Sequence, residues 1–190
     1  MTMFDMMSGT AVDKISPLVF EDELAQKALM PMGITSENVA EKFGISREKQ
    51  DTMALESHAK AAHANKEGWS QAEITPYKTK VLDKEENETE VLVDRDDGWR
   101  GKLSMANLAK LKPVFKKGGS TTAGNASQLT DGAAAVLLAR RSVATKMGLP
   151  IKGRLLSFAV AGVPPEVMGI GPAFAIPKAL SKCGLSVEDV

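Results

Sequence analysis

The 190-residue sequence contains a single cysteine, Cys183, so no disulfide can form within the chain and a reducing compartment is expected. It has no excess of charge: 24 basic residues balance 24 acidic ones, which gives no reason to expect nucleic acid or an anionic membrane as a partner. No apolar run approaches the roughly 18 residues of a spanning helix. The N-terminus lacks the basic region and apolar core of a secretory signal. What is present is an ordinary globular balance, 43% hydrophobic and 25% charged.

The first part of the chain, up to a soft boundary near Gly118, reads as a helical and hairpin module after an irregular segment at 1–30. Ser36 is expected to cap a short helix that ends at Gly44. Ser46 is expected to cap a longer helix from about Arg47 to Lys66, stopped by Gly68. The remaining expected elements are an edge strand at 73–79, an exposed acidic turn at 83–88, a second strand at 90–93 and a short helix within 104–111.

After Gly118 the pattern becomes that of a sheet core. The apolar run 133–139 fits a strand buried on both faces, with a short helix as the alternative, and 153–163 indicates another strand. Alternating strands and helices predict an α/β fold with a parallel or mixed sheet.

Helix signals accompany these two strands. Ser142 is expected to cap a helix that Gly148 ends, and a last helix is expected to hold Pro177 in its first turn and to end at Gly184. Residues 186–189 indicate the start of a capped turn or helix directly before the last residue. We therefore expect the chain to be a fragment of a longer protein.

Residues 119–127, Gly-Ser-Thr-Thr-Ala-Gly-Asn-Ala-Ser, are small or carry a hydroxyl or an amide, and they precede the apolar run. Small side chains let a ligand approach the backbone, and hydroxyls and amides supply hydrogen bonds. The pattern suggests a site for a long ligand with a polar backbone. On composition alone, a simple connector is the favoured alternative.

Three other features have a functional and a structural interpretation. The segment 39–47 resembles a helix-turn-helix, but acidic residues on the second helix and the zero net charge argue against DNA binding. His58 and His63 are five positions apart and point to different faces of one helix, so a surface or partly buried helix is favoured over a zinc site. Cys183 lies near a helix C-terminus, where the dipole disfavours a thiolate, so a structural thiol is expected.

Three blocks carry a specific resemblance: residues 32–40, Met-Gly-Ile-Thr-Ser-Glu-Asn-Val-Ala; residues 119–134, the small-residue loop with its continuation; and residues 163–172, Val-Pro-Pro-Glu-Val-Met-Gly-Ile-Gly-Pro. In this order and spacing they resemble the thiolase family, most of all its peroxisomal 3-ketoacyl-CoA type. The resemblance implies an α/β thiolase-like fold fragment, with an inserted helical and hairpin loop domain and part of a layered αβα core. The implied divisions are 1–30, the end of the N-terminal half; 31–118, the CoA-binding loop domain; 119–150, the last part of that half; and 151–190, the start of the C-terminal half.

The resemblance also implies an activity for the parent subunit: thiolytic cleavage of 3-ketoacyl-CoA in fatty-acid β-oxidation, with coenzyme A as substrate and no tightly bound cofactor. A homodimer, no membrane span, no nucleic acid and a peroxisomal location are implied, with a mitochondrial or cytoplasmic location as the alternatives. The family's Asn-Glu-Ala-Phe, Gly-His-Pro and Cys-x-Gly motifs do not occur in these residues, and Cys183 does not match its nucleophile motif. No catalytic residue is therefore assigned, and the chain alone is expected to be inactive with weak CoA affinity.

Residue by residue, the resemblance implies a CoA site. Ser127 corresponds to a residue that hydrogen-bonds the pantetheine arm, and Ala123 and Ala126 correspond to small residues against which that arm lies. Arg100 corresponds to a residue beside the CoA nucleotide, and Phe115 to an apolar wall.

Methionines supply the other part of the implied site. Met32 and Met168 match pocket methionines near the thioester, although either side chain alone would read as core. This sequence departs from the family pattern at two positions. Pro31 stands where many members have a histidine, which bears on acyl preference, and Asn107 stands where some members have a serine facing the CoA nucleotide. The alternative function is a non-catalytic CoA-binding or scaffold protein derived from a thiolase.

Overall fold

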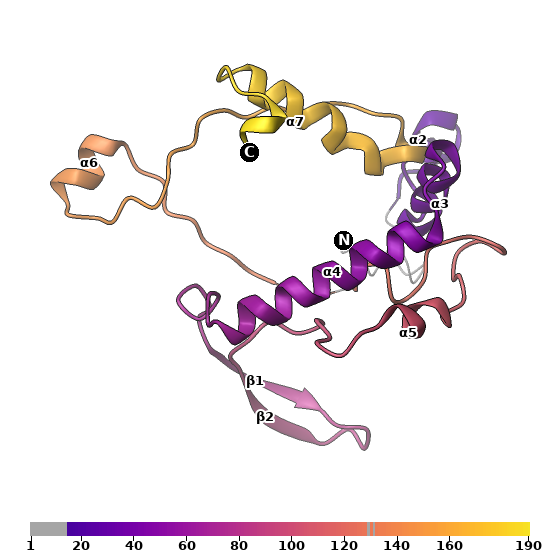
Figure 1. The fold of residues 1–190 in the computed structure, drawn as a ribbon, viewed down its shortest axis with the longest axis horizontal. Helices are drawn as coiled ribbons and strands as arrows, with labels where there is room; N and C mark the ends of the chain where they lie inside the picture. Colours follow the sequence, from indigo (N-terminus) through magenta and orange to yellow (C-terminus); the bar gives the residue numbers. More distant parts are fainter. Residues whose placement is uncertain (1–14, 129, 131) are drawn as a thin grey trace. The chain divides into compact units, whose positions relative to one another are not determined.

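The computed structural model describes residues 15–128, 130 and 132–190, and it divides into two compact units. Unit 1 covers Met1–Phe43 and Leu129–Val190, and unit 2 covers Gly44–Gln128. Figure 1 follows the chain through both units by colour. The domain divisions at residues 30, 118 and 150 stay predictions.

Unit 1 begins with helices where an irregular segment was expected. A 3-10 helix, η2 (Pro17–Phe20), is followed by α2 (Glu23–Lys27), whose first turn is capped by Asp22 accepting from the Ala25 N–H at 2.7 Å. The expectation of irregular structure is therefore wrong from residue 17 onward. A side-chain acceptor at the N-cap and the fixed φ of proline at the first helical position are enough to start such short helices.

The next helix, α3 (Met32–Phe43), starts earlier than predicted. The Pro31 carbonyl accepts from the N–H groups of Ile34 and Thr35, so the first helical hydrogen bonds of α3 lie N-terminal to Ser36. Ser36 therefore lies inside α3, and its prediction as the N-cap is wrong. The predicted end is confirmed, because Gly44 adopts φ +63°, a left-handed conformation that costs glycine little.

The C-terminal part of unit 1 comprises η3 (Pro165–Ile170), α7 (Gly171–Ser181) and η4 (Val187–Asp189). Pro172 occupies the first turn of α7, so the prediction that Pro177 would do so is wrong; Pro177 lies inside the helix. The end signal at Gly184 is confirmed by its φ of +71°. The predicted cap at Ser186 is also confirmed, as a capping box with Asp189.

Helix α6 (Arg141–Lys146) lies between the two apolar segments of unit 1. Its N-cap is Arg140, without a side-chain bond, so Ser142 is inside the helix and the predicted cap is wrong. The predicted C-terminal glycine is confirmed, with Gly148 at φ +63°.

Both predicted strands of unit 1 are wrong. Residues 133–139 and 153–163 have no regular secondary structure, and Val136, Leu137 and Leu138 are 82%, 81% and 75% exposed. A strand requires a backbone partner, and among the described residues only β1 and β2 supply one another with such a partner. The expected parallel or mixed sheet is therefore not formed by these residues.

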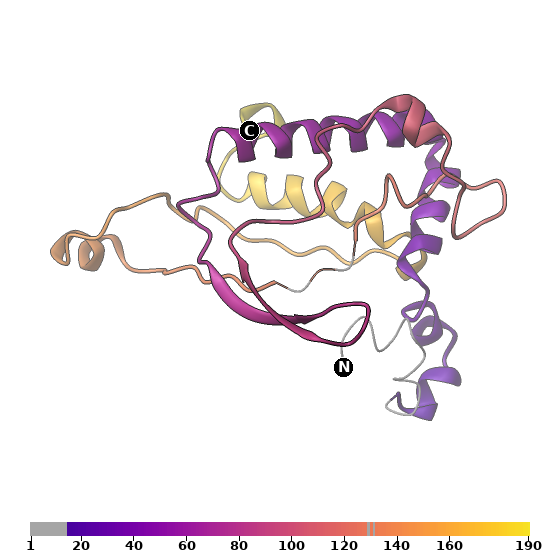
Figure 2. The same ribbon diagram turned by 90° about the horizontal axis from the view of Figure 1, so that it is seen from below.

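The second apolar segment contacts α7 instead, running beside it in Figure 2. The Ser157 hydroxyl donates to the Ala179 carbonyl at 2.6 Å. Lys178 and Lys182 donate to the carbonyls of Val160 and Phe158, at 3.0 and 2.6 Å. Lysine side chains of α7 and its C-cap thus satisfy backbone acceptors that a neighbouring strand would otherwise bind.

Unit 2 is organised by α4 (Arg47–Lys66), which has the predicted bounds. Ser46 caps it, its hydroxyl accepting from the Lys49 N–H at 3.2 Å, and Gly68 follows at φ +71°, as expected. The alanine-rich centre favours helix, and the cap satisfies one of the backbone donors at its start.

A hairpin and a short helix complete unit 2. Strands β1 (Tyr77–Leu82) and β2 (Glu88–Val93) pair antiparallel from Tyr77↔Val93 to Leu82↔Glu88. The first strand thus starts after Pro76, later than the predicted 73–79, because proline cannot donate to a ladder. The acidic turn lies between the strands but ends at residue 87, because β2 begins at Glu88, earlier than the predicted 90–93. Helix α5 (Met105–Ala109) is capped by Ser104 and is shorter than the predicted 104–111.

Candidate functional site

The small-residue loop 119–127 is held in one conformation by its own polar groups. The Asn125 side-chain oxygen accepts from the Thr122 N–H at 2.8 Å, and the Thr122 hydroxyl accepts from the Gly124 N–H at 3.2 Å. Thr122 is 0% exposed, so its hydroxyl and backbone are shielded from water. A loop whose turn is closed from within in this way offers a fixed backbone to a ligand.

A buried carboxylate on α4 anchors this loop. Asp51 is 2% exposed, and its two oxygens accept from different partners: Asn125 at 2.9 Å and the guanidinium of Arg47 at 2.7 Å. The Asn125 amide nitrogen also donates to the Ser120 carbonyl at 3.0 Å. The burial of the Asp51 charge is thus compensated by a cation and by a second hydrogen bond, as a buried ion requires.

Arg47 extends the network to the segment after α5. Its two terminal nitrogens donate to the carbonyls of Leu108 and Leu111, at 2.5 and 3.1 Å. Leu108 lies in the last turn of α5 and Leu111 follows the helix, and the Leu108 carbonyl also accepts from the Leu111 N–H at 3.0 Å. Gln50, one turn along α4, donates to the Ser120 hydroxyl at 2.9 Å. The first turn of α4 therefore fixes both the end of α5 and the loop.

Packing reinforces these bonds at Gly124. A Cβ atom at this position would lie 2.5 Å from methyl carbons of both Leu108 and Leu111. Leu108 is fully buried, so it has little room to move aside. Only glycine allows the loop to approach α5 this closely.

The three predicted site residues of the loop are exposed on this fixed backbone. Ala123, Ala126 and Ser127 all present their side chains to solvent, and the Ser127 hydroxyl donates to the adjacent Gln128 carbonyl at 3.0 Å. That hydroxyl keeps lone pairs for a ligand donor and can rotate to donate in its turn. The alanines leave room for a ligand to lie against the chain.

Arg100 and Phe115 also belong to unit 2. The Arg100 N–H donates to Nδ1 of His58 at 3.1 Å, which fixes the backbone beside α4 and leaves the arginine exposed. Phe115 lies in a turn closed by the Val114 N–H donating to the Thr121 carbonyl at 3.0 Å, directly before the loop. Five of the seven predicted site residues thus lie on unit 2.

The two predicted pocket methionines lie on neighbouring elements of unit 1. Met32 starts α3 and Met168 lies in η3, and these two elements pack against each other. The Asn38 amide joins them by donating to the Glu166 carbonyl at 3.0 Å. Met32 is 40% exposed and Met168 is 47% exposed, so neither residue is buried in the core of unit 1.

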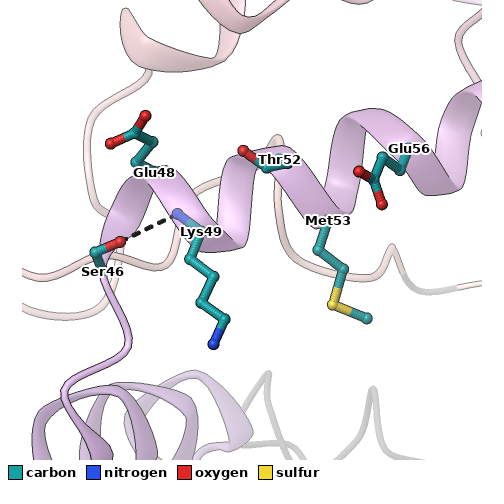
Figure 3. Close-up of a pocket in the computed structure, with 6 residues that line it drawn as sticks. All are labelled: Ser46, Glu48, Lys49, Thr52, Met53 and Glu56. Atoms are coloured by element: carbon teal, nitrogen blue, oxygen red, sulfur yellow. Dashed lines mark hydrogen bonds between the residues drawn. The ribbon is translucent and has the colours of Figure 1, made fainter.

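Two shallow hollows on unit 2 do not coincide with the predicted site. The larger, of about 490 Å³, is lined by residues of α4 and its cap alone, including Lys49, Met53 and Glu56 (Figure 3). The smaller, of about 240 Å³, lies beside Gly68 and Arg95. Since none of the seven predicted site residues lines either hollow, neither is assigned to the site.

Other chemistry considered from the sequence finds no support as a site. Cys183 donates to the Leu180 carbonyl at 3.2 Å near the end of α7, as expected for a structural thiol. His58 is half-buried and engaged with Arg100, while His63 is exposed and stacks edge-on with Trp69. The described residues contain no group of three or more potential metal-ligating His, Cys, Asp or Glu side chains. Within the same residues, no helix combines the length and apolarity needed to cross a membrane.

The sequence reasoning missed the network of Arg47, Asp51 and Asn125. Arg47 and Asp51 are one helical turn apart, a spacing at which opposite charges meet on a helix, and this was the available signal. On a helix with as many exposed charges as α4, that spacing alone does not reveal which carboxylate is buried.

Comparison with known proteins gives a consistent result. Family profiles match the chain twice, "Thiolase, N-terminal domain" over residues 2–142 and "Thiolase, C-terminal domain" over residues 149–190. The human peroxisomal 3-ketoacyl-CoA thiolase is 61% identical over 176 residues, which is 93% of this chain and 42% of the relative. 3-Ketoacyl-CoA thiolase 5 of Arabidopsis thaliana, also peroxisomal, is 54% identical over 187 residues, 98% of this chain and 41% of the relative.

Solved structures agree with the sequence matches. The dimeric peroxisomal thiolase of Saccharomyces cerevisiae superposes with a TM-score of 0.82 at 46% identity, covering 92% of this chain and 43% of that one. The chain thus spans about two fifths of the length of these relatives. The similarity confirms the predicted fold class, an α/β thiolase-like fragment.

Proposed function

Because the chain belongs to the thiolase family, we propose that its parent subunit is a 3-ketoacyl-CoA thiolase, an acetyl-CoA C-acyltransferase. In the proposed reaction, free CoA cleaves a 3-ketoacyl-CoA into acetyl-CoA and a shorter acyl-CoA, as a step of fatty-acid β-oxidation. The observation that carries this proposal is the 60–61% identity to rat and human 3-ketoacyl-CoA thiolases over 93% of the chain.

This segment would supply binding rather than covalent chemistry. Thiolysis requires an activated cysteine that carries the acyl group as a thioester, with partners that handle protons. The only cysteine here is Cys183, whose thiol contacts the Ser157 hydroxyl and the carbonyls of Ala179 and Leu180 rather than a histidine. We therefore place the nucleophile and its proton-transfer partners in parts of the subunit beyond these 190 residues.

Unit 2 is proposed to bind CoA along the loop 119–127. The pantetheine arm would lie against Ala123 and Ala126 and hydrogen-bond to Ser127, with Phe115 as an apolar wall. The exposed guanidinium of Arg100 suits the phosphates or the stacked adenine of the nucleotide. Met32 and Met168, on unit 1, are proposed to line the acyl pocket, where polarizable thioethers suit an apolar chain.

The test uses the subunit that carries this segment together with its catalytic parts. We expect Ser127→Ala to raise the KM for CoA about two- to tenfold, the range for loss of one hydrogen bond between neutral groups. Steady-state thiolysis of a 3-ketoacyl-CoA at varied CoA measures this effect. Ser57→Ala, at an exposed position of α4, is the matched control. An unchanged KM in the Ser127 variant would remove this residue from the site.

Assembly and location complete the proposal. A homodimer is proposed on the likeness to a yeast structure described as dimeric, and a peroxisomal location on the peroxisomal relatives. Light scattering of the purified subunit and fractionation of the source cells measure the two properties. A monomer, or a subunit found only in mitochondria or cytosol, would contradict the corresponding part.

The thiolysis assay, together with the mass of the native protein, separates the main proposal from a scaffold derived from a thiolase. An active subunit of about twice this length supports the enzyme. A native species near the calculated 20.3 kDa that binds CoA without turnover would instead support the scaffold.

A further inference from the structure

The conformation of the loop 119–127 depends on a residue far from it in sequence. We propose that Asp51 is the positioning residue of the proposed CoA-binding loop and that it acts through the side-chain amide of Asn125. The inference rests on the proposed function of that loop. Asp51 itself is 2% exposed, so it is placed to orient the loop rather than to contact the ligand.

The orientation of the Asn125 amide follows from its three partners. Its nitrogen faces two acceptors, an Asp51 oxygen at 2.9 Å and the Ser120 carbonyl at 3.0 Å. Its oxygen faces a donor, the Thr122 N–H at 2.8 Å. A flipped amide would oppose oxygen to oxygen and donor to donor, so the carboxylate selects a single orientation.

That orientation is transmitted to the exposed residues of the loop. The Asn125 oxygen holds Thr122, whose hydroxyl in turn holds the Gly124 N–H. Ala123, Ala126 and Ser127 lie between or directly after these fixed points. A change at Asp51 therefore moves the proposed contact residues without touching them.

Asp51 has its own anchor in Arg47. The guanidinium donates to Asp51 at 2.7 Å and to the Leu108 and Leu111 carbonyls, so the carboxylate cannot follow a displaced loop. Charge-assisted bonds of this kind are stronger and shorter than neutral ones. The anchor is thus built on the rigid first turn of α4.

The test is Asp51→Asn in the complete subunit. Arg47 and Asn125 donate to different oxygens of Asp51, and the variant replaces one of those oxygens with an NH2 group, which faces a donor, so one of the two bonds is lost. We expect the KM for CoA to rise about tenfold, as for a lost charge-assisted bond, while kcat stays within about twofold. Glu48→Gln, at an exposed position of the same helical turn, is the matched control and should change neither parameter.

Two further measurements separate positioning from stability. In an Asn125→Ala background, Asp51→Asn should raise the KM by less than about twofold, because the path through the amide is already broken. Amide hydrogen exchange of the free subunit should quicken at Thr122 and Gly124 in the Asp51 variant. If Asp51 served stability alone, Asp51→Asn would lower the Tm and the active fraction and leave the KM unchanged. Its effect on stability would then add to that of Asn125→Ala in the double variant.

The outcomes decide the inference separately from the proposed function. If Ser127→Ala raises the KM for CoA and Asp51→Asn does not, the positioning role is wrong and the CoA site stands. If the unmodified subunit neither binds CoA nor cleaves a 3-ketoacyl-CoA, the proposed function is wrong and the positioning role falls with it. Should Asp51→Asn fail to fold, Asn125→Ala breaks the same bond from the loop side, and an unchanged KM in that variant overturns the inference.

Discussion

At the scale of single residues, the polar groups that matter most are those with more than one partner. Asp51 and Asn125 each bind two or more groups, and together they connect the start of α4 to the loop. By contrast, the ion pairs Lys78–Glu90 and Lys80–Glu88 lie on exposed side chains of the hairpin and contribute little to stability. Burial and the number of partners, rather than charge, separate the two cases.

The stability of the turn at Asp83 is expected to depend on pH. Hydrogen bonds from the Asn87 N–H, the Asn87 side chain and the Glu85 N–H hold the pKa of Asp83 below its ordinary value of 3.8. Because the pKa is depressed in the folded state, the stabilisation of the turn is fully present above the ordinary value. It is lost as the pH falls through the folded-state pKa.

We therefore expect the Asp83 carboxyl to titrate below 3.8, measured from its side-chain carbon shift by NMR. Asn87→Ala should leave the pKa of Asp83 below its ordinary value but less depressed, because the backbone N–H of residue 87, the largest cause, remains and the side-chain bond is lost. An ordinary titration of Asp83 in the unmodified chain would contradict this account of the turn.

At the scale of elements, side-chain caps set where several helices begin. The Ser46 hydroxyl bonds to the Lys49 N–H at the start of α4, as the dashed line in Figure 3 shows. We expect Ser46→Ala to lower the free energy of unfolding by about 1 kcal/mol. Urea denaturation followed by circular dichroism measures this change.

Ser57→Ala is the control for the cap. It changes the same residue type at an exposed position inside α4, where alanine has the higher helix propensity, so no loss is expected. Equal losses in both variants would show that the cap contributes nothing specific.

Helix ends follow from local sequence signals, whereas strands and long-range bonds do not. Helix α4 and the glycine stops at Gly44, Gly68, Gly148 and Gly184 were predictable, because caps and left-handed glycines act locally. The strands at 133–139 and 153–163 were predicted from apolar runs and are wrong for the described residues. A strand depends on a neighbour, and sequence periodicity does not supply one. For the same reason the bond between Asp51 and Asn125 was not visible from local patterns.

At the scale of the whole molecule, two apolar segments of unit 1, residues 133–139 and 153–163, expose large apolar side chains. Leu155, Phe158 and Val160 are exposed, as are Val136, Leu137 and Leu138. Contiguous exposed apolar side chains are associated with interaction sites or aggregation. We expect the isolated chain to bind an apolar fluorescent dye such as ANS and to associate with increasing concentration.

Single lysine substitutions test this expectation. Leu137→Lys should lower dye fluorescence and association, measured by fluorescence and light scattering. Met53→Lys replaces an equally exposed but solitary apolar side chain on α4 and should change neither. A chain that stays monomeric and binds no dye would show that these segments are covered in solution.

The link between Asp51 and Asn125 also imposes an order of events during synthesis. The two residues are 74 positions apart, which at about 5–20 residues per second separates their appearance by about 4–15 s. During that interval α4 can form, since its cap and helical contacts are local. Its buried carboxylate has only Arg47 as a partner until the ribosome has delivered the loop. Unit 2 can therefore close only after the loop has been synthesised, and a pause between the two positions lengthens the time for which the nascent chain lacks the bond between Asp51 and Asn125.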